Sequence, residues 1–286
     1  MERRLLWIFG SPRSGSTWLL RMLDDCPGIT GVDEPLIGLH LAPFVCDRPG
    51  TYAEDLDLTN FSFNRIGREN RAAFFADQYR GAWQGPLREL ICARFGAQVK
   101  NDLLAIKEPN GSQGADLILE ALPRSRALFL LRDGRDVVDS VVASLGAGSW
   151  MSKRYPIRGI QDDDERMECL KDAAYKWVWQ TQVVHEALDR HGGPKLLMRY
   201  EDLRRDPHAR FSELVAWLGT SADVDAIVER HAFERLPTRG AGEFNRSATP
   251  GGWRSNLSEA EQHTIEEIMA PTLSRFGYAL EATARA

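Results

Sequence analysis

The chain has 286 residues, of which 43% are hydrophobic and 27% charged, and its formal net charge at pH 7 is −5. This length can bury a large core, and the composition is ordinary for a globular protein. The negative balance argues against nucleic-acid binding through general electrostatics, so any anion site must be a local group of arginines and backbone N–H groups. No apolar run approaches the roughly 20 residues of a membrane span. The scattered cysteines and histidines predict no metal site.

A glycine-containing loop follows the first apolar run. Residues 5–9 predict a buried strand, and residues 18–23 have the periodicity of a helix. Between them, residues 10–17 have the glycine spacing of a phosphate-binding loop, but Ser16 stands where ATP-binding loops carry lysine. The loop N–H groups and the helix N-terminus can still hold an anion, and Arg13 supplies a cation. The loop therefore predicts a phosphate site for an activated nucleotide other than ATP.

The remaining pattern is typical of an α/β fold, with strands and helices that alternate along the chain. Further buried parallel strands are predicted at residues 103–106, 127–131 and 195–198. Helices are predicted at residues 68–95 with an interruption around Gly85 and Pro86, and at residues 162–191, 208–218, 224–231 and 258–276. We expect a single domain over residues 1–286, with a central parallel sheet flanked by helices. An insertion at about residues 35–101 is long for a crossover between strands and is expected to carry substrate contacts.

Two later motifs are candidates for anion binding. Arg132 follows a predicted strand and Ser140 lies in the next helix, so Arg132 is expected at the sheet edge where ligands collect. An equally good interpretation is that Arg132 pairs with Asp133 or Asp136 and caps the helix. Residues 246–254 combine glycines, a tryptophan and two arginines with little periodicity. They predict either a loop that folds over an anionic ligand or an ordinary surface loop.

Taken in order along the chain, these motifs resemble the sulfotransferases that use 3′-phosphoadenosine 5′-phosphosulfate (PAPS). Residues 10–18 resemble that family's 5′-phosphosulfate loop, and residues 131–140 resemble its 3′-phosphate motif. Residues 246–254 are similar to its third motif, although Ser247 and Ala248 replace a lysine and a glycine. The resemblance implies the sulfotransferase fold, related to that of phosphate-loop nucleotide-binding proteins. It also implies transfer of a sulfuryl group from PAPS to a hydroxyl acceptor without a metal.

The resemblance also implies a set of donor-binding residues, with Arg13 and Lys107 in catalytic roles as well. Those around the 5′-phosphosulfate are Arg13, Ser14, Gly15, Ser16, Thr17 and Trp18, and those around the rest of the nucleotide are Arg132, Ser140, Tyr200, Arg246, Gly251 and Trp253. Arg13 and Lys107 are expected to neutralise the bridging oxygen as adenosine 3′,5′-bisphosphate (PAP) departs. A sulfuryl group carries less negative charge than a phosphoryl group, so magnesium is not required.

The general base is expected to be Glu34. Small-molecule members of the family carry a base histidine in a K-T-H motif, where this chain has Lys107 and Glu108 followed by proline. Tyrosylprotein sulfotransferases, and some bacterial ones, carry a glutamate soon after the first helix, and the interval from Arg13 to Glu34 matches the former. The alternative is that Glu34 only caps a turn. Glu108 and His40 are the reserve bases.

Other functions and the acceptor are left open by the sequence. A nucleotide kinase or NTPase would keep the phosphate loop, and a catalytically silent nucleotide-binding protein would bind PAP and transfer nothing. The acceptor is expected to be a small molecule or a peptide that carries a hydroxyl, bound by residues 35–101 and 150–161. The absence of a signal or anchor in this sequence indicates a cytoplasmic location, with no nucleic-acid partner.

Overall fold

The computed structural model describes residues 1–40, 80–99, 103–146, 148–154, 158–232, 235 and 249–281. By their internal contacts they form two compact units. The first unit comprises Met1–Leu131 with Trp179–Val228, and the second comprises Arg132–Val178 with Glu229–Ala286. The single domain over residues 1–286 stays a prediction, and most of the expected acceptor-binding insertion lies outside the described residues.

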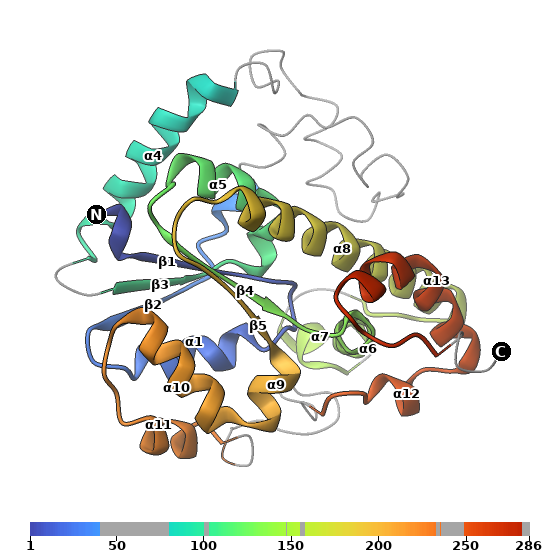
Figure 1. The fold of residues 1–286 in the computed structure, drawn as a ribbon. Helices are drawn as coiled ribbons and strands as arrows, with labels where there is room; N and C mark the ends of the chain where they lie inside the picture. Colours follow the sequence, from blue (N-terminus) through green and yellow to red (C-terminus); the bar gives the residue numbers. More distant parts are fainter. Residues whose placement is uncertain are drawn as a thin grey trace. The chain divides into compact units, whose positions relative to one another are not determined.

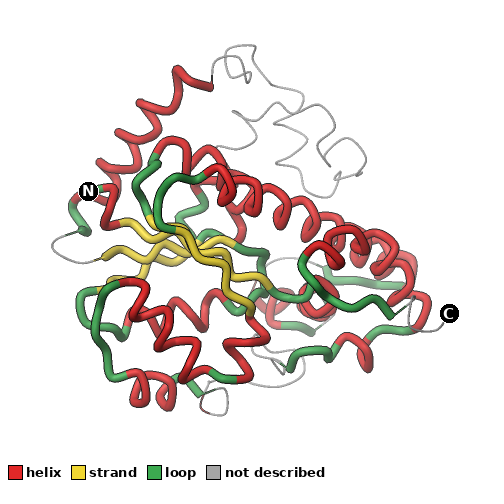
Figure 2. The backbone as a smooth tube through the Cα atoms, in the orientation of Figure 1, coloured by secondary structure: helices red, strands yellow, loops and turns green. Residues whose placement is uncertain are grey.

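A parallel sheet forms the centre of the first unit (Figures 1 and 2). Its strands are β1 (Leu5–Phe9), β2 (Ile29–Asp33), β3 (Leu103–Lys107), β4 (Arg126–Leu131) and β5 (Lys195–Arg199), in the order β2-β3-β1-β4-β5. Every neighbouring pair is parallel. All side chains of the central strand β1 are 0% exposed, which accounts for its unbroken apolar sequence. The predicted α/β class is confirmed.

The edge strand β2 was not among the predicted strands. It pairs with β3 in parallel, with Gly31 opposite Ala105 and Asp33 opposite Lys107. Thr30, Gly31 and Asp33 interrupt the apolar run, because an edge strand is buried less completely than a central one. This strand has a functional consequence: it places Glu34 immediately after the carboxyl end of β2, beside the end of β3.

Helices cover both faces of this sheet. The helices and 3₁₀ turns of the first unit are η1 (Glu2–Arg4), α1 (Ser16–Asp24), α4 (Arg80–Gly96), η6 (Pro109–Gly114), α5 (Ala115–Ala121), α9 (Tyr200–Arg205), α10 (Pro207–Leu218) and most of α11 (Val224–Arg230). In Figure 1, α1 and α10 lie on one side of the sheet and α4 and α5 on the other. The predicted break around Gly85 and Pro86 is wrong, because α4 continues through Pro86. Gly85 has no Cβ, which relieves the clash that a residue before proline meets in a helix.

The described part of the second unit is helical. It contains α6 (Gly134–Leu145), α7 (Trp150–Arg154), α12 (Trp253–Asn256) and α13 (Glu259–Arg275), while α8 (Asp163–Arg190) runs continuously from the second unit into the first. At the start of α13, the Ser258 hydroxyl accepts from the Glu261 N–H and Glu261 Oε2 accepts from the Ser258 N–H. None of the helices described has the length and apolar character that a membrane crossing requires.

Gly15, the N-cap residue of α1, has a backbone conformation that favours glycine. Its φ of 88° is left-handed, and a Cβ built on it would lie 2.5 Å from Tyr200 Cδ2. The ring of Tyr200, which is 3% exposed, therefore occupies the space that any other side chain would need.

We predict that Gly15→Ala lowers the free energy of unfolding by about 2–4 kcal/mol, from left-handed strain together with overpacking. Denaturant unfolding measures this loss. The matched control is Gly81→Ala, at an exposed position of α4 where a Cβ meets nothing within 4 Å, and which we expect to be neutral or slightly stabilising. Equal stability of the two variants would contradict the packing of Tyr200 on Gly15.

Candidate active site

The phosphate loop is anchored at its first residue. A Cβ built on Gly10 would lie 2.5 Å from the Leu130 carbonyl oxygen, so the loop passes directly against β4. The Ser112 hydroxyl accepts from the Gly10 N–H at 3.0 Å and donates to the Gly10 carbonyl at 2.7 Å. The entrance of the loop is thus held from η6, over a separation of 102 residues.

The loop leads into a helix start that suits an anion. Arg13 and Gly15 both have left-handed backbones, with φ of 68° and 88°, and no side chain caps α1. The first N–H groups of a helix have no intrahelical partner, so they can donate to an anion at this point. The Ser14 side chain is 0% exposed, and its Oγ has no hydrogen-bond partner among the described residues. These features fit a bound phosphate or sulfate group.

Lys107, the last residue of β3, brings a cation to this helix start. Its Nζ donates to Thr17 Oγ1 at 2.8 Å and forms ion pairs with Asp33 Oδ1 at 2.6 Å and Glu34 Oε1 at 2.9 Å. The Lys107 side chain is only 3% exposed, so these acceptors balance a buried charge. The loop lacks a lysine at Ser16, and β3 supplies one to the same turn of α1.

Glu34 has both carboxylate oxygens engaged by residues at the end of β3. Oε1 forms the ion pair with Lys107, and Oε2 accepts a hydrogen bond from Asn110 Nδ2 at 2.7 Å. The Glu34 N–H donates to the Lys107 carbonyl at 3.0 Å, and its φ of 43° is left-handed. The carboxylate is therefore bound by Lys107 and Asn110, and Lys107 also contacts Thr17 at the start of α1. Sequence reasoning did not find Asn110, since no local pattern signals a contact across 76 residues.

The reserve bases have different environments. Glu108 is 0% exposed, and its Oε1 accepts from the Ile37 N–H at 2.7 Å. Burial raises the pKa of Glu108 to about 7; the charge of Glu34 adds to this rise, while the N–H groups of Leu36 and Ile37 oppose it. Because Glu108 exposes no surface, it cannot meet an acceptor directly. The side chains of Glu34 and Asp33, 29% and 65% exposed, are the carboxylates beside Lys107 that reach solvent.

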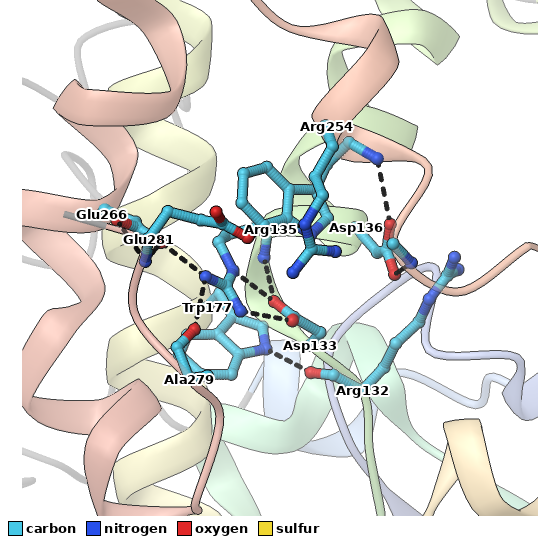
Figure 3. A network of polar contacts seen from close by, with 11 residues as sticks. Arg132, Asp133, Arg135, Asp136, Trp177, Arg254, Glu266, Ala279 and Glu281 are labelled. Carbon is cyan, nitrogen blue, oxygen red and sulfur yellow. Dashed lines mark hydrogen bonds and ion pairs between the residues drawn. The ribbon is translucent and has the colours of Figure 1, made fainter. Parts of the chain in front are cut away.

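In the second unit, the two later motifs are tied together (Figure 3). Asp136 Oδ2 accepts from the Gly251 N–H at 2.8 Å, and Asp136 Oδ1 accepts from the Trp253 N–H at 3.3 Å. Trp253 is 0% exposed, and the guanidinium carbons of Arg135 and Arg254 lie 4.3 Å and 4.5 Å from the centre of its ring. Helix α6 thereby holds the segment that begins α12.

Arg135 is the buried cation of this network. It forms ion pairs with Asp133 at 2.8 Å and Glu266 at 2.5 Å, and it donates to the Ala279 carbonyl at 2.9 Å. Asp133 also caps α6 by accepting from the Arg135 N–H. Sequence reasoning did not single out Arg135, whose partners in α13 and beyond lie more than a hundred residues away.

Arg132 lies next to Asp136. Trp177 Nε1 donates to the Arg132 carbonyl at 3.2 Å. Burial raises the pKa of Asp136, and the positive charge of Arg132 acts in the opposite direction. Both interpretations of Arg132, as an anion clamp and as a partner of Asp136, therefore stay open. Ser140 lies in α6, in the same unit.

The other predicted residues lie as follows. Trp18 packs edge-to-face on Tyr200, with ring centroids 6.4 Å apart, so both aromatic residues adjoin the loop of the first unit. His40 is exposed. Arg246 lies outside the described residues. No group of three or more His, Cys, Asp or Glu in the described part of the chain could hold a metal ion.

A parallel sheet with a glycine-containing loop after β1 is typical of nucleotide-binding α/β proteins, and here Lys107 of β3 brings a cation to the first turn of the following helix. The chain belongs to the sulfotransferase family, whose model matches residues 6–224. Protein-tyrosine sulfotransferase of Drosophila melanogaster is 24% identical over 237 residues, which are 82% of this chain and 42% of that relative. Nodulation protein NoeE of Sinorhizobium fredii is 25% identical over 96% of this chain and 66% of its own length.

These curated relatives are therefore longer proteins, of which this chain spans less than two thirds. Among solved structures, mouse sulfotransferase SULT7A1 complexed with PAP has a TM-score of 0.57 at 12% identity, covering 96% of this chain and 85% of that one. The predicted sulfotransferase fold is thereby confirmed.

The environment of Glu108 predicts a pH dependence of stability. Its carboxyl has a pKa of about 7 in the folded protein and an ordinary pKa of 4.5 in the unfolded chain, so the folded state binds the proton more tightly. We expect Glu108 to make the free energy of unfolding fall by about 3 kcal/mol as pH rises from 4.5 to 7. Urea unfolding between these values, compared with Glu108→Gln, measures the contribution. Identical slopes in the two proteins would show that Glu108 is not held in a desolvating site.

Proposed function

We propose that the protein is a PAPS-dependent sulfotransferase, with Glu34 as the general base. The observation that carries the proposal is the position of Lys107, whose ammonium contacts both Thr17 at the start of α1 and the Glu34 carboxylate. A cation between an anion-binding helix start and a carboxylate suits the transfer of an anionic group to a hydroxyl. The family and the PAP complex of a structural neighbour support the choice of donor.

Donor binding is assigned to the motif residues. The N–H groups and hydroxyls of residues 14–17 hold the 5′-phosphosulfate, and Arg13 and Lys107 balance its charge. Arg132 and Ser140 bind the 3′-phosphate, assisted by Arg246 and Tyr200. Gly251 and Trp253 complete the donor site, with the buried Trp253 ring shaping its segment. The uncapped α1 and the buried Ser14 hydroxyl are the features of this chain that fit such a ligand.

The transfer follows from these positions. PAPS supplies the sulfuryl group and PAP is the leaving group. As the acceptor oxygen bonds to sulfur and the bond from sulfur to the bridging oxygen breaks, Glu34 takes the hydroxyl proton. Lys107 and Arg13 stabilise the negative charge that develops on the bridging oxygen. Asn110, bonded to Oε2 of Glu34, holds the base with its other oxygen toward Lys107.

The acceptor is proposed to be a hydroxyl on a small molecule or a peptide. The likeness to a protein-tyrosine sulfotransferase puts a tyrosine peptide in the acceptor panel. A simple phenol, a sugar and a long-chain alcohol complete it, because they sample the other hydroxyl chemistries with different acidity and size.

We predict that Glu34→Gln lowers the turnover number about 10²- to 10⁴-fold with unchanged affinity for PAP, since only proton transfer is lost. Transfer of labelled sulfate from PAPS to the panel measures turnover, and calorimetry measures PAP binding. The matched control is Asp33→Asn, which removes the other carboxylate beside Lys107 and should cost less than tenfold. Full turnover by Glu34→Gln removes Glu34 from the mechanism. PAP binding by the wild type without transfer to any acceptor would indicate a silent nucleotide-binding protein.

We predict that Arg132→Glu weakens PAP binding at least tenfold and brings it close to the affinity for 5′-AMP, which lacks the 3′-phosphate. Calorimetry with both nucleotides separates this loss from damage to the 5′ site. Arg190→Glu, the same charge change at an exposed residue outside the motifs, is the control and should leave both affinities unchanged. Equal weakening of both nucleotides by Arg132→Glu would show that Arg132 does not recognise the 3′-phosphate.

A further inference from the structure

The buried carboxylate of Glu108 has no part in the mechanism derived so far. It directly follows Lys107 and is 0% exposed. Its Oε1 accepts from the Ile37 N–H at 2.7 Å. Its Oε2 has no hydrogen-bond partner among the described residues. Burying a carboxylate is costly unless hydrogen bonds or paired charges offset the lost hydration.

The segment that Glu108 binds is the turn that carries Glu34. Glu34 and Leu36 have φ values of 43° and 60°, on either side of Pro35. Two left-handed non-glycine residues this close together are unfavourable, and they persist only where the surroundings over-determine the backbone. Glu108 accepts from the N–H of Ile37, the residue that directly follows this strained stretch.

Close backbone packing keeps this arrangement free of solvent. A Cβ built on Gly111 would overlap Glu108 Oε2, and one built on Gly38 would overlap the Gly111 carbonyl. The turn after Glu34 is therefore pressed against η6, with the Glu108 carboxylate enclosed between them. A hydrogen bond in such surroundings is strengthened by the low local dielectric.

The end of β3 thus controls Glu34 in two ways. Lys107 and Asn110 bind the oxygens of its side chain, and Glu108 binds the backbone of its turn. We propose that Glu108 is a positioning residue, which fixes the turn after β2 so that the Glu34 carboxylate points at the reacting hydroxyl. This inference rests on the proposed role of Glu34 as base.

The test uses the full chain and the transfer of labelled sulfate from PAPS to water, which requires no knowledge of the natural acceptor. Glu108→Met, which removes the acceptor oxygens, is expected to slow this transfer roughly 10- to 100-fold through misplacement of the base, with unchanged affinity for PAP. Glu108→Gln, which keeps an oxygen for the Ile37 N–H, is expected to recover most of the rate. Glu108→Gln also keeps the test decisive should the Met variant fail to fold.

A double variant separates positioning from a direct role. If Glu108 acts only through Glu34, then Glu34→Gln combined with Glu108→Met is no slower than Glu34→Gln alone. Multiplied losses in the double variant, or wild-type rates in Glu108→Met, would overturn the proposal. Equal transfer rates in the wild type and Glu34→Gln would count against the proposed base and against the inference that rests on it. A lower rate in Glu34→Gln together with a wild-type rate in Glu108→Met would count against this inference alone.

Glu2→Met is the matched control for structural damage. Glu2 is another buried carboxylate, 4% exposed. It precedes β1, whereas Glu108 follows β3, so the two residues lie at opposite ends of neighbouring parallel strands. We expect Glu2→Met to lower the melting temperature without changing the transfer rate. A similar loss of rate in Glu2→Met would show that any buried carboxylate has this effect, and would refute a specific role for Glu108.

Discussion

The buried ammonium of Lys107 is the contact on which the candidate site depends. It joins the first turn of α1, the end of β2 and the residue that follows β2 through three acceptors. This one charge balances the carboxylates of both Asp33 and Glu34 beside the start of α1. Its position also explains how the phosphate loop dispenses with the lysine of ATP-binding loops, because a neighbouring strand delivers the cation.

The motif residues of the second unit have a structural role besides the ligand binding proposed for them. Asp136 holds the backbone of Gly251 and Trp253, and the Trp253 ring lies between two guanidinium groups. A fully buried ring of this kind stabilises the segment rather than presenting a surface. A motif that is read along the sequence as a ligand contact can thus consist of one residue that binds and others that hold it in place.

The strands were predictable where the apolar run is unbroken. Continuous apolar runs identified β1, β3, β4 and β5, and glycine spacing identified the phosphate loop. The expected burial is wrong for β5, an edge strand in which Lys195 and Leu197 are exposed and only Met198 is buried. The edge strand β2 was not predicted, because Gly31 and Asp33 interrupt its apolar pattern. The pairing that sets Asp33 opposite Lys107 was therefore not predicted either. Glu34 was identified through the family resemblance. Its partner Asn110 and the contact of Glu108 with the Ile37 N–H were not predicted, since both join residues more than 70 positions apart through the adjacency of β2 and β3.

The left-handed backbone of Glu34 restricts what the site can become. Only glycine, asparagine and aspartate adopt that conformation readily, and β-branched residues are nearly excluded from it. Substitution of Glu34 is therefore limited by the backbone conformation as well as by the need for an acidic side chain. A residue that replaces Glu34 must adopt this bend as well as accept a proton, next to a segment that the enclosed Glu108 side chain binds through the Ile37 N–H.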